Sequence, residues 1–150
     1  TAGYTSHLAA SDIHLAGDEP QQDRVDAYNI FGRYDWGGNR YHVLADYTAA
    51  LSEFDPADLD ANADGEGDQP MALNTEFVYE PKPDMLWGAS YQMTDEMVDY
   101  PESSYGVMYG ERLSDLVMLK LAYTHGEYGD YVTAGQQSED CLVAEIGLMF

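Results

Sequence analysis

Three things are scarce in this sequence: cysteine, basic residues and long apolar runs. Cys141 is the single cysteine, so no disulfide can form within the chain. No stretch approaches the roughly 20 apolar residues that a membrane-spanning helix requires. The N-terminal residues have neither the basic nor the apolar region of a signal peptide, so we expect any such peptide to be absent or already removed.

The shortage of basic residues leaves the chain strongly acidic. Its 150 residues include 28 acidic and 6 basic side chains, which gives a net charge of −22. This charge repels phosphate, so it argues against nucleic-acid binding and against docking on anionic lipid through basic residues. It favours a cationic partner or a metal ion. Hydrophobic residues make up 45% and aromatic residues 13%, which argues against a disordered chain.

Alternation of apolar and polar residues with a period of two runs through most of the chain. It is clearest at the C-terminus, where the even positions from Leu142 to Phe150 are apolar and Glu145 and Gly147 lie between them. Helical periodicity is weak, so we expect an all-β fold. The expected strands are 2–14, 24–35, 40–53, 71–80, 85–95, 104–113, 116–127 and 141–150.

The connections between these strands alternate in length. The tight turns are 36–39, 81–84 and 113–115, and the long polar connections are 15–23, 54–70, 96–103 and 128–140. Tight turns on one rim and long loops on the other are typical of membrane barrels. An even number of strands places both chain ends at the tight-turn rim. The sequence therefore predicts one domain, 1–150, folded as an antiparallel up-and-down transmembrane β-barrel of about eight strands, with a long acidic loop at 54–70.

A soluble β-sandwich shows the same alternation with its apolar faces turned inward, and this alternative stays open. Two features favour the membrane. Tyrosine and tryptophan lie mostly on the apolar sides of the strands, several near strand ends, where membrane barrels carry aromatic girdles. More than half of the acidic residues lie in the long connections, which places their charge at one rim.

The opposite sides of the strands carry charges of both signs with glycines between them. In a narrow barrel such charges can pair inside the lumen. Either they form a packed ion-pair network that fills the lumen, or they line a gated or selective polar path. The residues expected in this polar network are Arg33, His42, Asp46, Glu76, Arg112, Lys120 and Glu145.

The long acidic loop contains a D-x-N-x-D-G motif that begins at Asp60. Oxygens at this spacing converge on calcium in EF-hand loops, with glycine at the sixth position for the sharp turn. Position twelve holds Met71 in place of the bidentate glutamate, so we expect no EF-hand. The open alternatives are a simpler calcium loop and a solvated acidic turn. The expected calcium ligands are Asp60, Asn62, Asp64 and Asp68.

Catalytic motifs are not evident, and we expect no enzyme activity. The histidines are dispersed, without metal-ligand spacing, at positions 7, 14, 42 and 125. No serine lies in a nucleophile-elbow context. Cys141 follows Glu139 and Asp140, whose negative charges disfavour a reactive thiolate.

Two features resemble known outer-membrane proteins. Phe150 after alternating apolar residues resembles the C-terminal assembly signal of bacterial outer-membrane proteins. Residues 69–150 resemble the C-terminal part of the LbtU-type siderophore porins, in the segments 74–83, 87–92, 101–106, 119–128 and the closing strand. The resemblance implies the outer membrane of a Gram-negative bacterium, contact with lipid and the assembly machinery, and passage of small solutes or siderophores.

The resemblance also implies a difference in size. Members of that family are longer barrels that can enclose a pore, whereas an eight-stranded barrel is filled by its own side chains. The alternative function is therefore a narrow closed barrel with a structural or surface-interaction role, whose acidic loops bind calcium. A further alternative is one part of a larger assembly.

Overall fold

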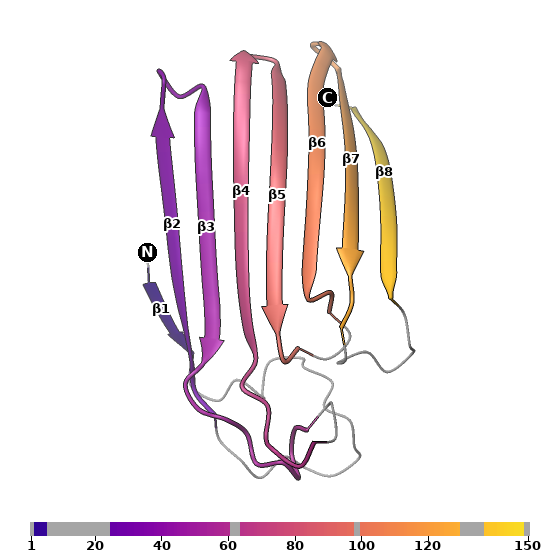
Figure 1. Cartoon of the computed structure of the whole chain (residues 1–150). Helices are drawn as coiled ribbons and strands as arrows, with labels where there is room; N and C mark the ends of the chain where they lie inside the picture. The colour runs from indigo at the N-terminus through magenta and orange to yellow at the C-terminus, as the bar shows by residue number, and fades with distance from the viewer. Residues whose placement is uncertain (1, 6–24, 61–63, 98–99, 130–136, 149–150) are drawn as a thin grey trace.

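The computed structural model describes residues 2–5, 25–60, 64–97, 100–129 and 137–148, which form one antiparallel sheet (Figure 1). Eight strands pair in chain order from β1 to β8. The strands are β1 (Ala2–Thr5), β2 (Ala27–Trp36), β3 (Tyr41–Ala50), β4 (Met71–Lys82), β5 (Met85–Asp95), β6 (Ser103–Ser114), β7 (Val117–Glu127) and β8 (Ser138–Leu148). This confirms the predicted all-β, up-and-down antiparallel fold.

Each predicted strand has a counterpart, with differences at the ends. The described part of the first strand ends at Thr5, and the rest of the predicted segment 2–14 lies outside the described residues. The third strand ends at Ala50 instead of residue 53, because the chain there turns into the long loop. The last strand begins at Ser138 instead of residue 141, because 138–140 continue the pairing with β7 although they are polar. Phe150 lies outside the described residues.

The tight turns lie at one end of the sheet and the long connections at the other (Figure 1). Between β2 and β3, Gly37, Gly38 and Asn39 all have positive φ angles, of 63°, 70° and 64°. Glycine adopts this conformation without the steric cost that a Cβ atom brings. A Cβ on Gly37 would also lie 2.7 Å from the ring of Tyr41, so the Gly-Gly-Asn sequence determines this turn.

Both edges of the described sheet are free. β1 pairs with β2 and β8 pairs with β7, and the structure gives no pairing between β1 and β8 in the part of the chain that it describes. The sheet is therefore open, and the closed transmembrane barrel stays a prediction. Because the strand number is even, β1 and β8 run antiparallel.

The buried hydrophobic core of the described residues is small and lies at the long-loop end. Val25, Ala50, Phe54 and Leu59 form it, where the loop after β3 folds against the strand ends. The strands themselves belong to one sheet, and no second described sheet covers either of its faces. Among the residues that the structure describes, no helix is long and apolar enough to cross a membrane.

Candidate functional site: the polar face of the sheet

The pairing register divides the strand residues between two faces, because residues directly opposite each other in antiparallel strands lie on the same side. We call the face that carries Arg33 and Glu76 the polar face, and the face that carries Trp36 and Tyr41 the apolar face. In β2, Asn29 and Arg33 lie on the polar face, whereas Tyr28 lies on the apolar face. The register places every residue of the predicted polar network on the polar face: Arg33, His42, Asp46, Glu76, Arg112, Lys120 and Glu145.

The tightest charged group of the polar face lies beside the turn between β2 and β3. Asp35 Oδ1 accepts a hydrogen bond from Arg33 Nε at 2.8 Å and lies 2.5 Å from His42 Nδ1. On the far side of the imidazole, Nε2 is 3.4 Å from Glu80 Oε1. The His42 side chain is 9% exposed, and the two more exposed carboxylates flank its ring on either side. The sequence prediction missed Asp35 and Glu80, although both continue the period of two on their strands.

The centre of the polar face holds hydrogen-bonding groups around a hollow of about 410 Å³. Asp46 accepts a hydrogen bond from Asn29 Nδ2 at 2.9 Å, and the same amide nitrogen donates to Thr48 Oγ1 at 2.8 Å. Glu76, on the next strand, also lines the hollow. The other polar side chains of this face around it are Asn74, Ser90, Gln92, Ser104 and Thr124.

Two further ion pairs connect strands near the tight turns. Lys120 and Glu145 are direct cross-strand partners on the polar face, with Nζ and Oε2 3.7 Å apart. Arg112 Nε lies 3.4 Å from Asp84 Oδ1 in the turn between β4 and β5. The predicted network is therefore several separate groups and not one connected chain of contacts among the described residues.

Side chains crowd the polar face in the middle of the sheet. A Cβ on Gly106 would lie 2.7 Å from Ser90 Oγ and 3.1 Å from the Tyr123 carbonyl oxygen. A Cβ on Gly88 would lie 2.6 Å from Met108 Cγ. On the apolar face, a Cβ on Gly32 would meet nothing within 4 Å among the described atoms. The glycines of the polar face therefore leave room for neighbouring groups that a Cβ atom would crowd.

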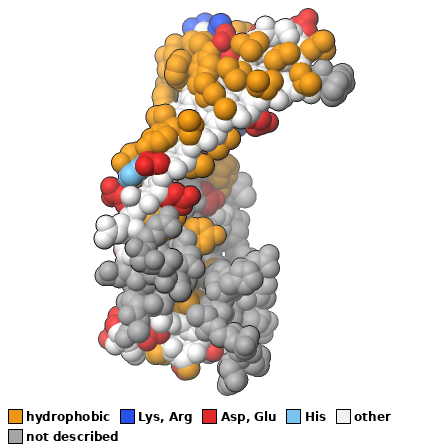
Figure 2. All heavy atoms as spheres, turned by 90° about the vertical axis from the view of Figure 1, so that its right-hand side faces the viewer, with side chains coloured by type: hydrophobic (Ala, Val, Ile, Leu, Met, Phe, Trp, Pro, Cys, Tyr) orange, Lys and Arg blue, Asp and Glu red, His pale blue; other side chains and the backbone are white. Residues whose placement is uncertain are grey.

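Aromatic rings dominate the apolar face. One cross-strand row carries five aromatic residues on five consecutive strands: Trp36, Tyr41, Tyr79, Trp87 and Tyr109. Within this row, the ring centroids are 5.4 Å apart for Trp36 and Tyr41 and 4.6 Å for Trp87 and Tyr109. Hydrophobic side chains gather over the upper part of the molecule as seen from the β8 edge, with acidic side chains further toward the loop end (Figure 2).

A polar group that the sequence did not indicate lies on the apolar face near the long loops. Asp140 Oδ1 accepts a hydrogen bond from Tyr123 OH at 2.6 Å and lies 2.8 Å from His125 Nδ1. The Tyr105 ring lies 5.1 Å from the His125 ring. This group joins residues 15 and 17 positions apart, so only the register of β7 against β8 shows it.

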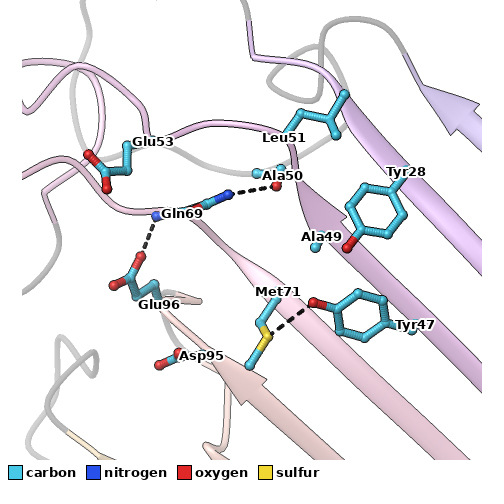
Figure 3. A pocket seen from close by; sticks show the side chains of 10 residues that line it. All are labelled: Tyr28, Tyr47, Ala49, Ala50, Leu51, Glu53, Gln69, Met71, Asp95 and Glu96. Atoms are coloured by element: carbon cyan, nitrogen blue, oxygen red, sulfur yellow. Dashed lines mark hydrogen bonds between the residues drawn. The ribbon is translucent and has the colours of Figure 1, made fainter.

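A second hollow, of about 440 Å³, lies at the long-loop end of the apolar face (Figure 3). Tyr28 and Tyr47 line it side by side, with ring centroids 5.7 Å apart. Gln69 also lines the hollow and connects two of its sides. Its amide Nε2 donates to the Ala50 carbonyl at 3.0 Å, and its backbone N–H donates to Glu96 (Figure 3). Its charged lining residues are the acids Glu53, Asp95 and Glu96.

The predicted calcium loop is described in part, because Asn62 lies outside the described residues. Asp60 accepts hydrogen bonds from the backbone N–H groups of Asp64 and Gly65, at 3.1 and 3.0 Å. Asp68 is buried, with 3% of its surface exposed. The described part of the chain contains no group of three or more His, Cys, Asp or Glu residues arranged for a metal ion. Calcium binding therefore stays a prediction.

Comparison with models of protein families, with curated proteins and with solved structures gave no significant match. The resemblance to the siderophore porins is therefore still carried by the sequence segments alone. Cys141, on the polar face of β8, is a free and exposed thiol.

Proposed function

We propose that this chain is a membrane-spanning β-barrel of the outer-membrane porin type, which lets small solutes or siderophores cross the outer membrane of a Gram-negative bacterium. The uncovered apolar face is the observation that carries this proposal. Burying one large apolar side chain is worth about 1.5–3 kcal/mol, so a whole face of them favours contact with lipid. The exposed side chains are Ile30, Tyr34, Trp36, Val43, Phe77, Trp87, Tyr91, Tyr105, Val107, Leu121, Tyr123, Leu142, Ile146 and Leu148.

Strand length supports the same proposal. The strands β2 to β8 have 10 to 12 residues. A transmembrane strand tilted by about 45° requires about 9–11 residues. In hydrocarbon every backbone N–H and C=O must find a partner within the protein, which a closed barrel provides. The polar face then lines the lumen, and Phe150 takes part in recognition by the assembly machinery.

The two tryptophans of the chain test the membrane part of the proposal. Trp36 and Trp87 both lie on the apolar face and are 37% and 49% exposed. In lipid vesicles we expect brominated lipid to quench their fluorescence more strongly than aqueous acrylamide does. A control chain with Trp36→Phe, Trp87→Phe and Phe31→Trp carries its one tryptophan on the polar face, and brominated lipid should quench it little. Equal quenching of both chains would contradict the proposal.

Conductance separates transport from a second candidate, a sealed barrel with a structural or surface-interaction role. The ion pairs of the polar face favour this second candidate, because they can fill a narrow lumen. For a porin we expect discrete conductance steps in planar bilayers, with lower cation selectivity after Asp46→Asn with Glu76→Gln. The matched control is Glu127→Gln on the apolar face. A heat-modifiable gel band without conductance would favour the sealed barrel.

A further inference from the structure

We infer that β8 closes the barrel by pairing with β1 in one register, in which the two residue numbers of each facing pair add up to 150. This inference rests on the proposed membrane barrel and adds the partner of its free edge. It places Ala2 opposite Leu148 and Thr5 opposite Glu145. Four observations carry it: the exposed edge of β8, the direction of the two strands, the face on which each residue lies, and the two residues at the ends of one cross-strand row.

The β8 edge carries exposed apolar side chains from Leu142 to Leu148, with Glu145 among them, and it has no strand partner beyond β7 among the described residues. Leu142 and Ile146 are 78% and 70% exposed on the apolar face, and Val143 is 50% exposed on the polar face. A long, hydrophobic edge strand invites pairing with another strand. β1 offers the other free edge of the same sheet and runs antiparallel to β8.

The division into two faces excludes every second register between β1 and β8. Tyr4 stands opposite Tyr28, which lies on the apolar face, and Thr5 stands opposite Ala27 on the polar face. On β8, Ile146 lies on the apolar face and Glu145 on the polar face. A closed barrel keeps lipid-facing residues together, because a slip of one residue turns every side chain to the other face. Tyr4 must therefore face an even-numbered residue of β8.

One cross-strand row gives the starting point for the stagger. It follows direct partners across all eight strands: Ala2, Ile30, Tyr47, Leu73, Met93, Ser103, Glu127 and Ser138. If the strands stood upright, closure would place Ala2 opposite Ser138. Membrane strands tilt instead, so the two ends of a row are displaced along the strand on closure.

The tilt sets the size of this displacement. With strands about 4.8 Å apart, a rise of about 3.3 Å per residue and a tilt of about 35–45°, closing eight strands requires a stagger of about 8–12 residues. A stagger of about ten, from the middle of that range, moves the partner of Ala2 from Ser138 to Leu148, which is the last residue of β8. A displacement in the other direction would move β1 away from β8.

Disulfide trapping tests the register. In a Cys141→Ser chain refolded in lipid vesicles, Thr5→Cys is combined with Glu145→Cys. The controls combine it with Val143→Cys or Gly147→Cys, which lie on the same face two residues away. We expect the Glu145→Cys pair to form an intramolecular disulfide at least about tenfold faster than either control, because thiols on Cα atoms more than about 7 Å apart cannot bridge without backbone movement. A second pair, Tyr4→Cys with Ile146→Cys, tests the same register on the apolar face.

The outcomes separate this inference from the proposed function. Faster trapping at Val143→Cys or Gly147→Cys would overturn the register while supporting a closed barrel. A cross-link of dimer mass would overturn the inference by giving the β8 edge to a second copy. Absence of trapping in both pairs overturns it as well. If the double-cysteine variant under reducing conditions still shows a heat-modifiable band, the proposed barrel is kept although the register is wrong. If the wild type shows no such band, the proposed barrel is wrong as well.

Discussion

Asp35 and Trp36 are neighbours in β2, yet their surroundings differ completely. Asp35 faces the polar side, where Arg33 and His42 satisfy its carboxylate. Trp36 faces the apolar side, where it stacks on Tyr34 and Tyr41 and is still 37% exposed. The polar face thus pairs many of its charges within the chain, whereas the apolar face leaves large apolar side chains exposed in spite of their ring contacts. This exposed apolar surface is what the proposed membrane barrel would place against lipid.

The largest effect that we predict comes from placing a charge on each face in turn. Val107 lies on the apolar face, 59% exposed, and its neighbour Met108 lies on the polar face. In lipid vesicles, Val107→Lys should lower the free energy of unfolding by about 2–4 kcal/mol, the cost of a basic residue on the lipid side near mid-bilayer. Met108→Lys, of similar length, should cost less than half as much. Denaturant titration of both variants measures the difference, and equal losses would show that the faces share one environment.

The next effect concerns the polar face alone. Asp35→Asn removes the carboxylate that Arg33 and His42 share, so we expect it to lower the free energy of unfolding by more than the loss of a single exposed ion pair does. Asp84→Asn is the matched control, because the Asp84–Arg112 pair is about half exposed and 3.4 Å long. We expect the control to cost at most about 1 kcal/mol. The prediction is wrong if the two variants lose the same stability.

A smaller effect belongs to the aromatic row of the apolar face. The rings of Tyr41 and Tyr79 lie 4.9 Å apart with planes at 13°. A double-mutant cycle with Tyr41→Ala and Tyr79→Ala should give a coupling of about 0.5–1.5 kcal/mol. The same cycle with Tyr41→Ala and Tyr109→Ala should be additive, because β4 and β5 separate these two residues. Coupling as strong in the second cycle would mean that the substitutions disturb the whole sheet.

Local alternation predicted the strands and their faces because both depend on neighbouring residues. From Val117 to Thr124 the alternating sequence predicts which residues lie on each face, and the register gives the same division. The Gly-Gly-Asn turn is equally local. Contacts between residues far apart in the sequence could not be predicted from it. The contact of Asp140 with His125 depends on how β7 pairs with β8, and the contact of Glu80 with His42 depends on how β3 pairs with β4. Sequence patterns indicate which residues share a face, whereas register decides which of them meet.

The smallest predicted effect uses salt to compare two ion pairs. Lys120–Glu145 lies on the polar face, with both side chains 58% exposed in the open sheet, and Lys82–Glu111 lies 2.9 Å apart beside the tight turns. At low salt, charge-swap cycles should give each pair a small favourable coupling. At 1 M salt the Debye length falls to about 3 Å, so the coupling of an exposed pair should largely vanish.

A lumen that is filled by its own ion pairs, as in the sealed-barrel candidate, shields those pairs from this screening, whereas a water-filled pore does not. For the sealed barrel we therefore expect the Lys120–Glu145 coupling to persist at 1 M salt while the Lys82–Glu111 coupling disappears. Loss of both would mean that Lys120 and Glu145 meet water and salt, either in a conducting pore or in an open sheet. The conductance measurement separates those two cases, because a pore gives discrete steps and an open sheet gives none.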